Sequence, residues 1–254
     1  LPKAITCYER ALKLDPRYIE AMINKAACLI ELNDRESAFP FLESALELGR
    51  SMQLTNAEVW SALGSLYYSL LKMDQSIYCF DIVLNLDPGH LNGWISKGRI
   101  LLQLGWYKEA IECYQQALAI DDKCIEAAYQ IGEALIDMKD YDESVKFLQK
   151  RVESLDSKLL NGSLRINKNR ICDWDNYQSV LSDLADEIES STLEMAPFAI
   201  LHFSDSPQFQ LRAAELWNIR EGKNENEYCK AHDLSNVKIK VGYFSPDFSS
   251  HAVA

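Results

Sequence analysis

The sequence lacks the cysteine spacing of a metal knuckle and any apolar run long enough to cross a membrane. Its seven cysteines include no Cys-x-x-Cys pair, and their odd number fits no obvious disulfide framework, so we expect reduced thiols in a cytoplasmic protein and no metal site. No apolar run reaches about 18 residues and no charged-then-apolar leader is present, so neither a membrane span nor a secretory signal is assigned.

Basic residues are also scarce. The chain has 26 Lys and Arg against 38 Asp and Glu, and its net charge is −12. Nucleic acid and anionic membrane surfaces would repel such a chain, so we expect neither as a partner. Hydrophobic residues make up 48% of the 254 residues, which is ample for a core and argues against a fully disordered chain. Proteins or small molecules fit better as partners.

What the sequence does contain is an internal repeat. At a spacing of 34 residues, the segments 57–88, 91–122 and 125–156 align without gaps. Four shared positions hold Trp60, Trp94 and Ala128; Gly64, Gly98 and Gly132; Tyr67, Leu101 and Leu135; and Phe80, Tyr114 and Leu148. This spacing and pattern are typical of tetratricopeptide repeats, each of which is a pair of antiparallel helices.

The same pattern extends toward the N-terminus. An earlier copy begins at Ile19 and carries a four-residue insertion near its end, and a half-repeat at 3–16 precedes it. Small residues such as Gly98 and Ala26 in the first helix predict a close approach of the second helix, with large residues filling the remaining space. We therefore expect a repeat array over 1–156, wound into a right-handed superhelix because each repeat buries its faces only against its neighbours.

The concave wall of such a superhelix is a candidate groove for an extended peptide. Two positions of each first helix could face it; they hold Asn24, Ala62, Ser96 and Gln130 at the sixth, and Glu20, Glu58, Asn92 and Glu126 at the second. Such a wall would be polar and acidic, which favours basic or polar protein segments. A solvated acidic face without any ligand is the alternative.

Several other conspicuous residues are assigned to structure rather than chemistry. Cys7, Cys79 and Cys113 share one position in the second helix, next to a large aromatic residue, which predicts core thiols. Most tyrosines and tryptophans of the repeats lie at packing positions in acidic surroundings, which argues against base stacking. His90 follows a Leu-Asp-Pro-Gly turn, and we expect it to be solvated.

After Asp156 the period is lost. Residues 157–236 are expected to form a helical linker, with helices over roughly 175–190 and 207–220. From residue 237 the stretch "VKIKVGYFS" alternates apolar and polar residues before it turns apolar, which predicts a strand. One strand is not stable alone, so its partners would lie beyond residue 254.

Two motifs in this last part carry a family resemblance. Residues 242–251 read G-Y-x-S-x-D-F-x-x-H, and residues 172–174 are Cys-Asp-Trp. Together with the repeats before them, these motifs resemble the protein O-linked N-acetylglucosamine transferases and their relatives, which include the SPINDLY-type O-fucosyltransferases. The resemblance implies a mainly α chain in which residues 237–254 open the acceptor-side, Rossmann-like lobe of a GT-B type glycosyltransferase.

The resemblance also implies an activity. It implies an inverting transfer of N-acetylglucosamine from UDP-N-acetylglucosamine to Ser or Thr hydroxyls of proteins that the repeats bind. His251 would be the active-site histidine, contacting the acceptor or helping its deprotonation. Asp247 would fix the loop through backbone hydrogen bonds. Ala252 stands where the family often has Pro, which puts the stiffness of this loop in doubt.

Two alternatives stay open at this point. One is a non-catalytic scaffold that recruits partners through its repeats, and the other is an enzyme of the same family that transfers fucose. The chain begins with Leu1 rather than Met and ends directly after the motif, so we expect a fragment of a longer protein. Because the donor lobe would lie outside it, the fragment should be inactive alone and hold no cofactor.

Overall fold

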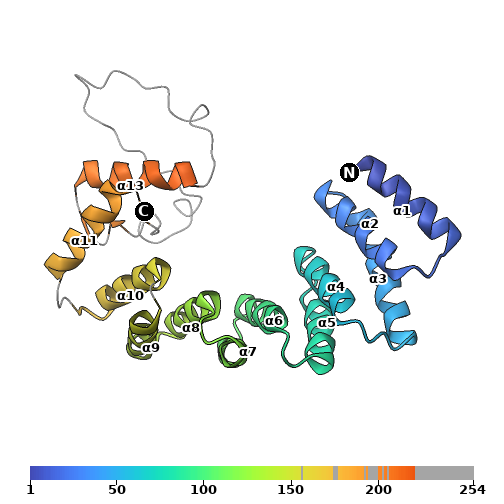
Figure 1. Cartoon of the computed structure of the whole chain (residues 1–254), viewed down its shortest axis with the longest axis horizontal. Helices are drawn as coiled ribbons and strands as arrows, with labels where there is room; N and C mark the ends of the chain where they lie inside the picture. Colours follow the sequence, from blue (N-terminus) through green and yellow to red (C-terminus); the bar gives the residue numbers. More distant parts are fainter. Residues whose placement is uncertain are drawn as a thin grey trace, which may run out of the picture.

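The fold of the described residues is entirely helical. The residues that the computed structural model describes are 1–155, 157–173, 177–191, 193, 200–201, 203–204 and 206–220. They form twelve helices and no strand. In Figure 1 the helices follow one another around an open arc that begins with α1 and runs to α13.

Nine of these helices belong to the predicted half-repeat and repeats. They are α1 (Pro2–Leu14), α2 (Ile19–Glu31), α3 (Arg35–Ser51), α4 (Ala57–Ser69), α5 (Met73–Leu86), α6 (Leu91–Gln103), α7 (Tyr107–Ile120), α8 (Ile125–Asp137) and α9 (Tyr141–Ser154). The first helices α2, α4, α6 and α8 begin at the residues where the sequence alignment starts a repeat. α3 has 17 residues whereas α5 has 14, so most of the predicted insertion lengthens a second helix.

Small residues let the two helices of each repeat approach closely, as the sequence predicts. A β-carbon on the glycine of the first helix would lie within 3 Å of a large side chain on the second helix in three repeats, in the pairs Gly64–Phe80, Gly98–Tyr114 and Gly132–Leu148. Ala26 and Leu42, the corresponding residues of the first full repeat, are fully buried. The complementarity of small and large side chains therefore sets the spacing within every repeat.

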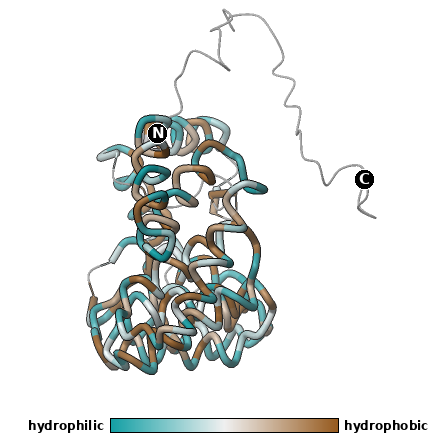
Figure 2. Tube along the Cα trace, turned by 90° about the vertical axis from the view of Figure 1, so that its right-hand side faces the viewer, coloured by the Kyte–Doolittle hydropathy of each residue, from teal (hydrophilic) through white to brown (hydrophobic). Residues whose placement is uncertain are grey.

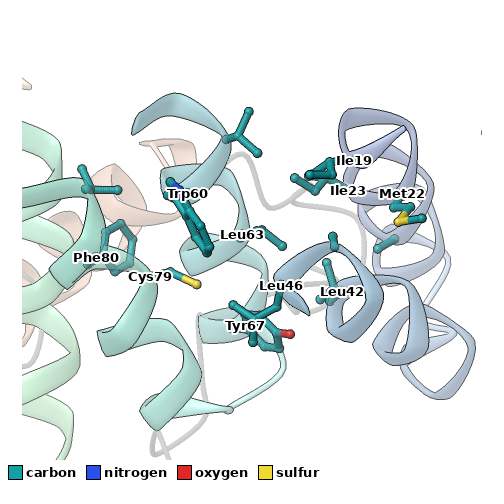
Figure 3. Close-up of a cluster of buried hydrophobic side chains, with 14 of the residues drawn as sticks. Ile19, Met22, Ile23, Leu42, Leu46, Trp60, Leu63, Tyr67, Cys79 and Phe80 are labelled. Carbon is teal, nitrogen blue, oxygen red and sulfur yellow. The ribbon is translucent and has the colours of Figure 1, made fainter. Parts of the chain in front are cut away.

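The tryptophans near the start of two first helices tie these helices to the preceding loop. The indole Nε1 of Trp60 donates a hydrogen bond to the carbonyl of Leu54 at 2.9 Å, and that of Trp94 donates to the carbonyl of Pro88, also at 2.9 Å. Figure 3 shows Trp60 within the core that α2 to α5 share, close to Phe80 and Leu63. Each indole therefore packs and also satisfies a loop carbonyl.

The turns inside the repeats share one backbone conformation. The second residue after each first helix, which follows the C-cap, has a positive φ, and these residues are Asn33, Leu71, Gly105 and Lys139. The next backbone N–H in each case bonds back across the helix end, as Lys72 N does to Tyr67 O at 2.9 Å. This left-handed residue closes the helix and reverses the chain into the second helix.

α10 (Lys158–Arg170) continues this pattern beyond the predicted end of the period. It packs against both α8 and α9, and the residue that ends its turn, Cys172, also has a positive φ. α10 thus lies where the first helix of a further repeat would lie. Leu160 and Leu164 of α10 pack into the hydrophobic core of the preceding repeats, and buried polar contacts also join α10 to the array. Asn167 Nδ2 donates to Ser144 Oγ at 3.1 Å, and Ser144 Oγ donates to the Gly132 carbonyl at 3.0 Å.

The two remaining helices form a small core of their own. α11 (Tyr177–Glu189) and α13 (Pro207–Arg220) confirm the two helices predicted for this region. Leu184 and Phe203 are among its buried residues, and Arg165 of α10 joins it to the array through Glu187 at 3.0 Å. The predicted strand and glycosyltransferase segment, 237–254, lie outside the described residues.

Hydrophobic and hydrophilic residues alternate along the whole Cα trace of the array, as Figure 2 shows. This is the pattern of amphipathic helices that bury one face against their neighbours. Within the described ranges, none of the helices has both the length and the apolar character that a membrane span requires.

Candidate functional site

The candidate site lies on the inner side of the arc. In Figure 1 the first helices α4, α6, α8 and α10 line this side, and the second helices α5, α7 and α9 line the outer side. Side chains at repeated positions of successive first helices meet there. Arg99 of α6, for example, bonds Glu126 of α8, and Ser163 of α10 donates to Glu133 of α8 at 3.0 Å.

A hollow of about 100 Å³ opens between α4 and α6 on this face. Its lining consists of Ser65, Tyr68, Phe80, Ser96, Arg99 and Ile100. Phe80 and Ile100 are almost fully buried, so they form an apolar base. The other four residues add hydroxyl groups and a guanidinium group. Such a hollow can hold a small apolar side chain while its rim hydrogen-bonds a polypeptide backbone.

The inner face is less acidic than the sequence suggests, because several of its carboxylates are engaged. Glu126 pairs with Arg99, and each of these side chains is 47% exposed. Burial raises the pKa of Glu133, although the hydrogen bond from Ser163 works in the opposite direction. Glu58 lies 3.7 Å from Nε2 of His90. An incoming segment therefore meets paired charges as well as carboxylates.

Of the groove residues predicted from the sequence, the structure places Ser96 in the hollow. Asn24 is exposed on α2, and Gln130 is partly buried on α8, but neither lines the hollow. Sequence reasoning missed Arg99 and Tyr68. Arg99 follows Ser96 by three residues, and residues with this spacing share a face of a helix, so a wider search of that face would have included it.

The residues of the family resemblance lie mostly elsewhere. His251, Asp247 and Trp174 are outside the described residues. Cys172 is the left-handed residue after α10, with a φ of 57°, and Asp173 lies 3.3 Å from Lys168. Cys172 and Asp173, the described part of this motif, therefore lie in the turn that follows α10. Within the described ranges no group of three or more His, Cys, Asp or Glu is arranged to hold a metal ion.

The predicted core thiols are confirmed at two of three positions. Cys79 and Cys113 are buried, and burial raises the pKa of Cys79 to about 12 and that of Cys113 to about 11. Such thiols stay protonated and unreactive near neutral pH. The prediction is wrong for Cys7, which is exposed, because α1 packs mainly against α2 among the described helices and leaves Cys7 uncovered.

The prediction of a solvated His90 is also wrong. His90 is the N-cap of α6, and its Nδ1 accepts a hydrogen bond from the backbone N–H of Gly93 at 2.9 Å. Only 13% of its side chain is exposed. Histidine is an unusual N-cap residue, so its type alone did not indicate this role.

Comparisons with known proteins agree with the helix pairs. Residues 98–139 match the family described as TPR repeat, and residues 125–154 match the family described as tetratricopeptide repeat. With the repeated helix pairs and turns described above, these matches show that residues 98–154 are tetratricopeptide repeats.

Among curated proteins, the chain is similar to the peroxisomal targeting signal receptor of Saccharomyces cerevisiae. The two are 23% identical over 182 residues, a match that covers 57% of this chain and 30% of the receptor. It is also similar to the human superkiller complex protein 3, with 24% identity over 143 residues, 56% of this chain and 9% of that protein. The chain thus spans less than a third of either relative.

Two solved structures share the fold. The MamA crystal structure is 24% identical with a TM-score of 0.52, covering 59% of this chain and 79% of that one. YrrB, described as a TPR protein with an unusual peptide-binding site, is 19% identical with a TM-score of 0.51, covering 82% and 97%. None of these four proteins is described as a glycosyltransferase, so the comparisons support the repeat part of the resemblance alone.

Proposed function

We propose that the inner face of the array binds an extended segment of a partner protein, with the hollow between α4 and α6 at its centre. The observation that carries this proposal is the hollow itself, where buried Phe80 lies below the polar groups of Ser96 and Arg99. YrrB, which has the same fold, is described as having a peptide-binding site, and the similar yeast protein is named a receptor for a targeting signal. Both descriptions favour a binding module.

The side chains that line the hollow indicate which chemical groups its ligand should carry. Arg99 offers N–H donors to a peptide carbonyl or carboxylate, and the hydroxyl of Ser96 can donate or accept. Binding a carboxylate would compete with the Arg99–Glu126 pair, whose exposed position makes it weak enough to exchange. The exposed Glu20 and Asn24 at the N-terminal end of the face favour polar or basic residues in the same ligand.

An array of random 12-residue peptides, probed with the 254-residue chain, tests this proposal. The tightest peptides would be labelled, and their affinities measured by fluorescence anisotropy for the wild type and for Arg99→Ala and Ser96→Trp. We expect both substitutions to weaken binding by about tenfold, because one removes donors and the other fills the hollow. Lys108→Ala, an exposed change on the outer helix α7, is the matched control. Equal affinities for all four proteins would refute the site.

We further propose that the array serves as the substrate-binding part of a protein O-glycosyltransferase. The specific observation in favour is the ten-residue motif G-Y-x-S-x-D-F-x-x-H at 242–251. A motif with six specified positions rarely arises by chance, and here it follows repeats in the order that the family has. In this proposal His251 contacts the acceptor hydroxyl, and Asp247 holds the loop. The donor is UDP-N-acetylglucosamine or, alternatively, GDP-fucose.

The natural full-length protein is needed to test this activity. It would be incubated with radiolabelled UDP-N-acetylglucosamine and cell lysate, and in parallel with labelled GDP-fucose. Transfer of label that His251→Ala abolishes, with an unchanged circular dichroism spectrum, would support the enzyme and identify its donor. Absence of transfer from both donors would leave the non-catalytic scaffold, and the peptide-binding experiment would be unaffected by that result.

A further inference from the structure

A second and larger cavity lies on the outer side of the array. Its volume is about 490 Å³, and residues of α5, α6 and α7 line it. We call it the tryptophan pocket, after Trp94 and Trp106 in its lining; Lys97, Glu109 and Glu112 also line it. Trp94, Lys97 and Leu101 form one stripe of α6, and Ser96 and Arg99 lie on the opposite face of that helix. The tryptophan pocket is therefore separate from the hollow of the inner face.

In the preceding repeat, aromatic and cationic side chains fill the equivalent place. Tyr78, which precedes Glu112 by one repeat length of 34 residues, packs edge-on against Trp60 with 6.4 Å between ring centroids. The guanidinium of Arg50 stacks on the Tyr78 ring at 4.1 Å. A cation supplied by the chain thus covers the aromatic surface there.

The following repeat repeats the arrangement with different residues. Phe147 occupies the position equivalent to Cys113, and the guanidinium of Arg151 lies 5.6 Å from the centre of its ring. Elsewhere Lys25 and Lys72 lie over Phe41 and Phe39. Covering a ring with a cation is therefore a recurrent feature of this array.

The repeat formed by α6 and α7 has the aromatic surface, but no cation among the described residues covers it. In the described part of the chain, no Lys or Arg stacks on Trp94 or Trp106, and Trp106 is 53% exposed. Lys97 reaches the pocket, but Asp81 neutralises it at 2.6 Å. Glu112 replaces the aromatic ring of Tyr78, and Glu109 adds a second exposed carboxylate. The pocket thus combines open indole surface with two carboxylates that form no ion pair within the described part of the chain.

We propose that the tryptophan pocket binds an arginine side chain of a partner protein. A planar guanidinium can stack on an indole and donate paired hydrogen bonds to a carboxylate, which a lysine ammonium cannot do in the same way. The net charge of −12 would draw basic partners to the chain. This site goes beyond the proposed function, because it lies on the other side of α6 and uses none of the inner-face residues.

Nuclear magnetic resonance of the indole N–H groups can test this proposal directly. The ¹⁵N-labelled chain would be titrated with Ac-Gly-Arg-Gly-NH2, and the indole peaks of Trp94 and Trp106 assigned from Trp→Phe variants. The neutral isostere Ac-Gly-citrulline-Gly-NH2 and the apolar Ac-Gly-Leu-Gly-NH2 would be titrated separately for comparison. We expect the arginine peptide to shift both peaks with an affinity about tenfold above that of either comparison peptide. Its affinity should fall as the salt concentration is raised.

Two variants separate this site from general attraction to an acidic protein. Glu112→Tyr introduces the residue of the preceding repeat and should abolish the shifts by filling the pocket, whereas Arg99→Ala on the inner face should leave them unchanged. The buried Trp60 supplies an internal control peak that should not move. Equal shifts with the citrulline or leucine peptide, or shifts that persist in Glu112→Tyr, would overturn the proposal. Failure of the inner-face experiments would not affect it.

Discussion

The ring of Tyr114 occupies the space that any side chain at Gly98 would need. A β-carbon at Gly98 would lie 2.8 Å from Cζ of Tyr114, well inside van der Waals contact. Both residues sit in the centre of the array, where Tyr114 is fully buried. The pair shows how one atom decides the distance between two helices of a repeat.

This contact predicts that Gly98→Ala is destabilising although alanine favours helices. Overpacking at this distance should cost about 1–3 kcal/mol, which exceeds the helix propensity gained by replacing glycine. Urea unfolding followed by circular dichroism measures the loss. The chain itself suggests a rescue, because its first full repeat uses Ala26 with Leu42. Gly98→Ala with Tyr114→Leu should be less destabilised than the sum of the single variants; strict additivity would contradict the steric explanation.

The buried hydroxyl of Ser144 should matter more than that of Ser76. Ser76 Oγ donates to the Gly64 carbonyl at 2.6 Å, whereas Ser144 Oγ donates to Gly132 and also accepts from Asn167. Ser144→Ala leaves the Asn167 amide without this partner, so we expect a loss of about 1–3 kcal/mol. Ser76→Ala should cost less, since alanine already occupies this position at Ala110. Thermal melts of both variants test the order, and a larger loss for Ser76→Ala would be inconsistent with it.

His90 should contribute to stability as a helix cap. Replacing it with alanine removes the acceptor for the Gly93 N–H and should cost about 1 kcal/mol. His90→Asn keeps a side-chain acceptor at the cap and should retain most of the stability. The free energy of unfolding of the three proteins distinguishes them. If the asparagine variant were as unstable as the alanine variant, packing rather than capping would explain the role of His90.

Buried thiols should make stability fall in strong alkali. The ordinary thiol pKa of 9.0 rises to about 12 at Cys79 and about 11 at Cys113, chiefly through burial. Because the folded pKa exceeds the unfolded value, this contribution is complete below about pH 9 and is lost as the pH rises through the folded pKa. Melting temperatures between pH 8 and pH 11 should fall less steeply in Cys79→Ala than in the wild type. Cys7→Ala, at an exposed thiol, should keep the wild-type slope, and identical slopes in all three would argue against the assignment.

The periodicity of small and large residues was enough to predict the helix pairs. Gly64, Gly98 and Gly132 recur at one spacing because the same steric problem recurs in every repeat. Positions that depend on a neighbouring element were predicted less well. Cys7 has the residue pattern of a core thiol, but no helix within the described residues covers it. α10 packs into the array through Leu160 and Leu164 and through the hydrogen bond of Asn167 to Ser144, and that polar contact adds nothing to the apolar period.

The candidate sites also combine features that residue spacing predicts with features that depend on the tertiary structure. The sixth-position rule found Ser96, since a helix places residues on a face by spacing alone. It could not show that Arg99 bonds Glu126, or that the outer side opens into a pocket at Trp94. Those features depend on how successive repeats stack and on which side chain of one repeat fills the space beside the next. Local spacing encodes each helix and its partner, whereas grooves and charge pairs arise only between repeats, where residues about 30 positions apart meet in the folded superhelix.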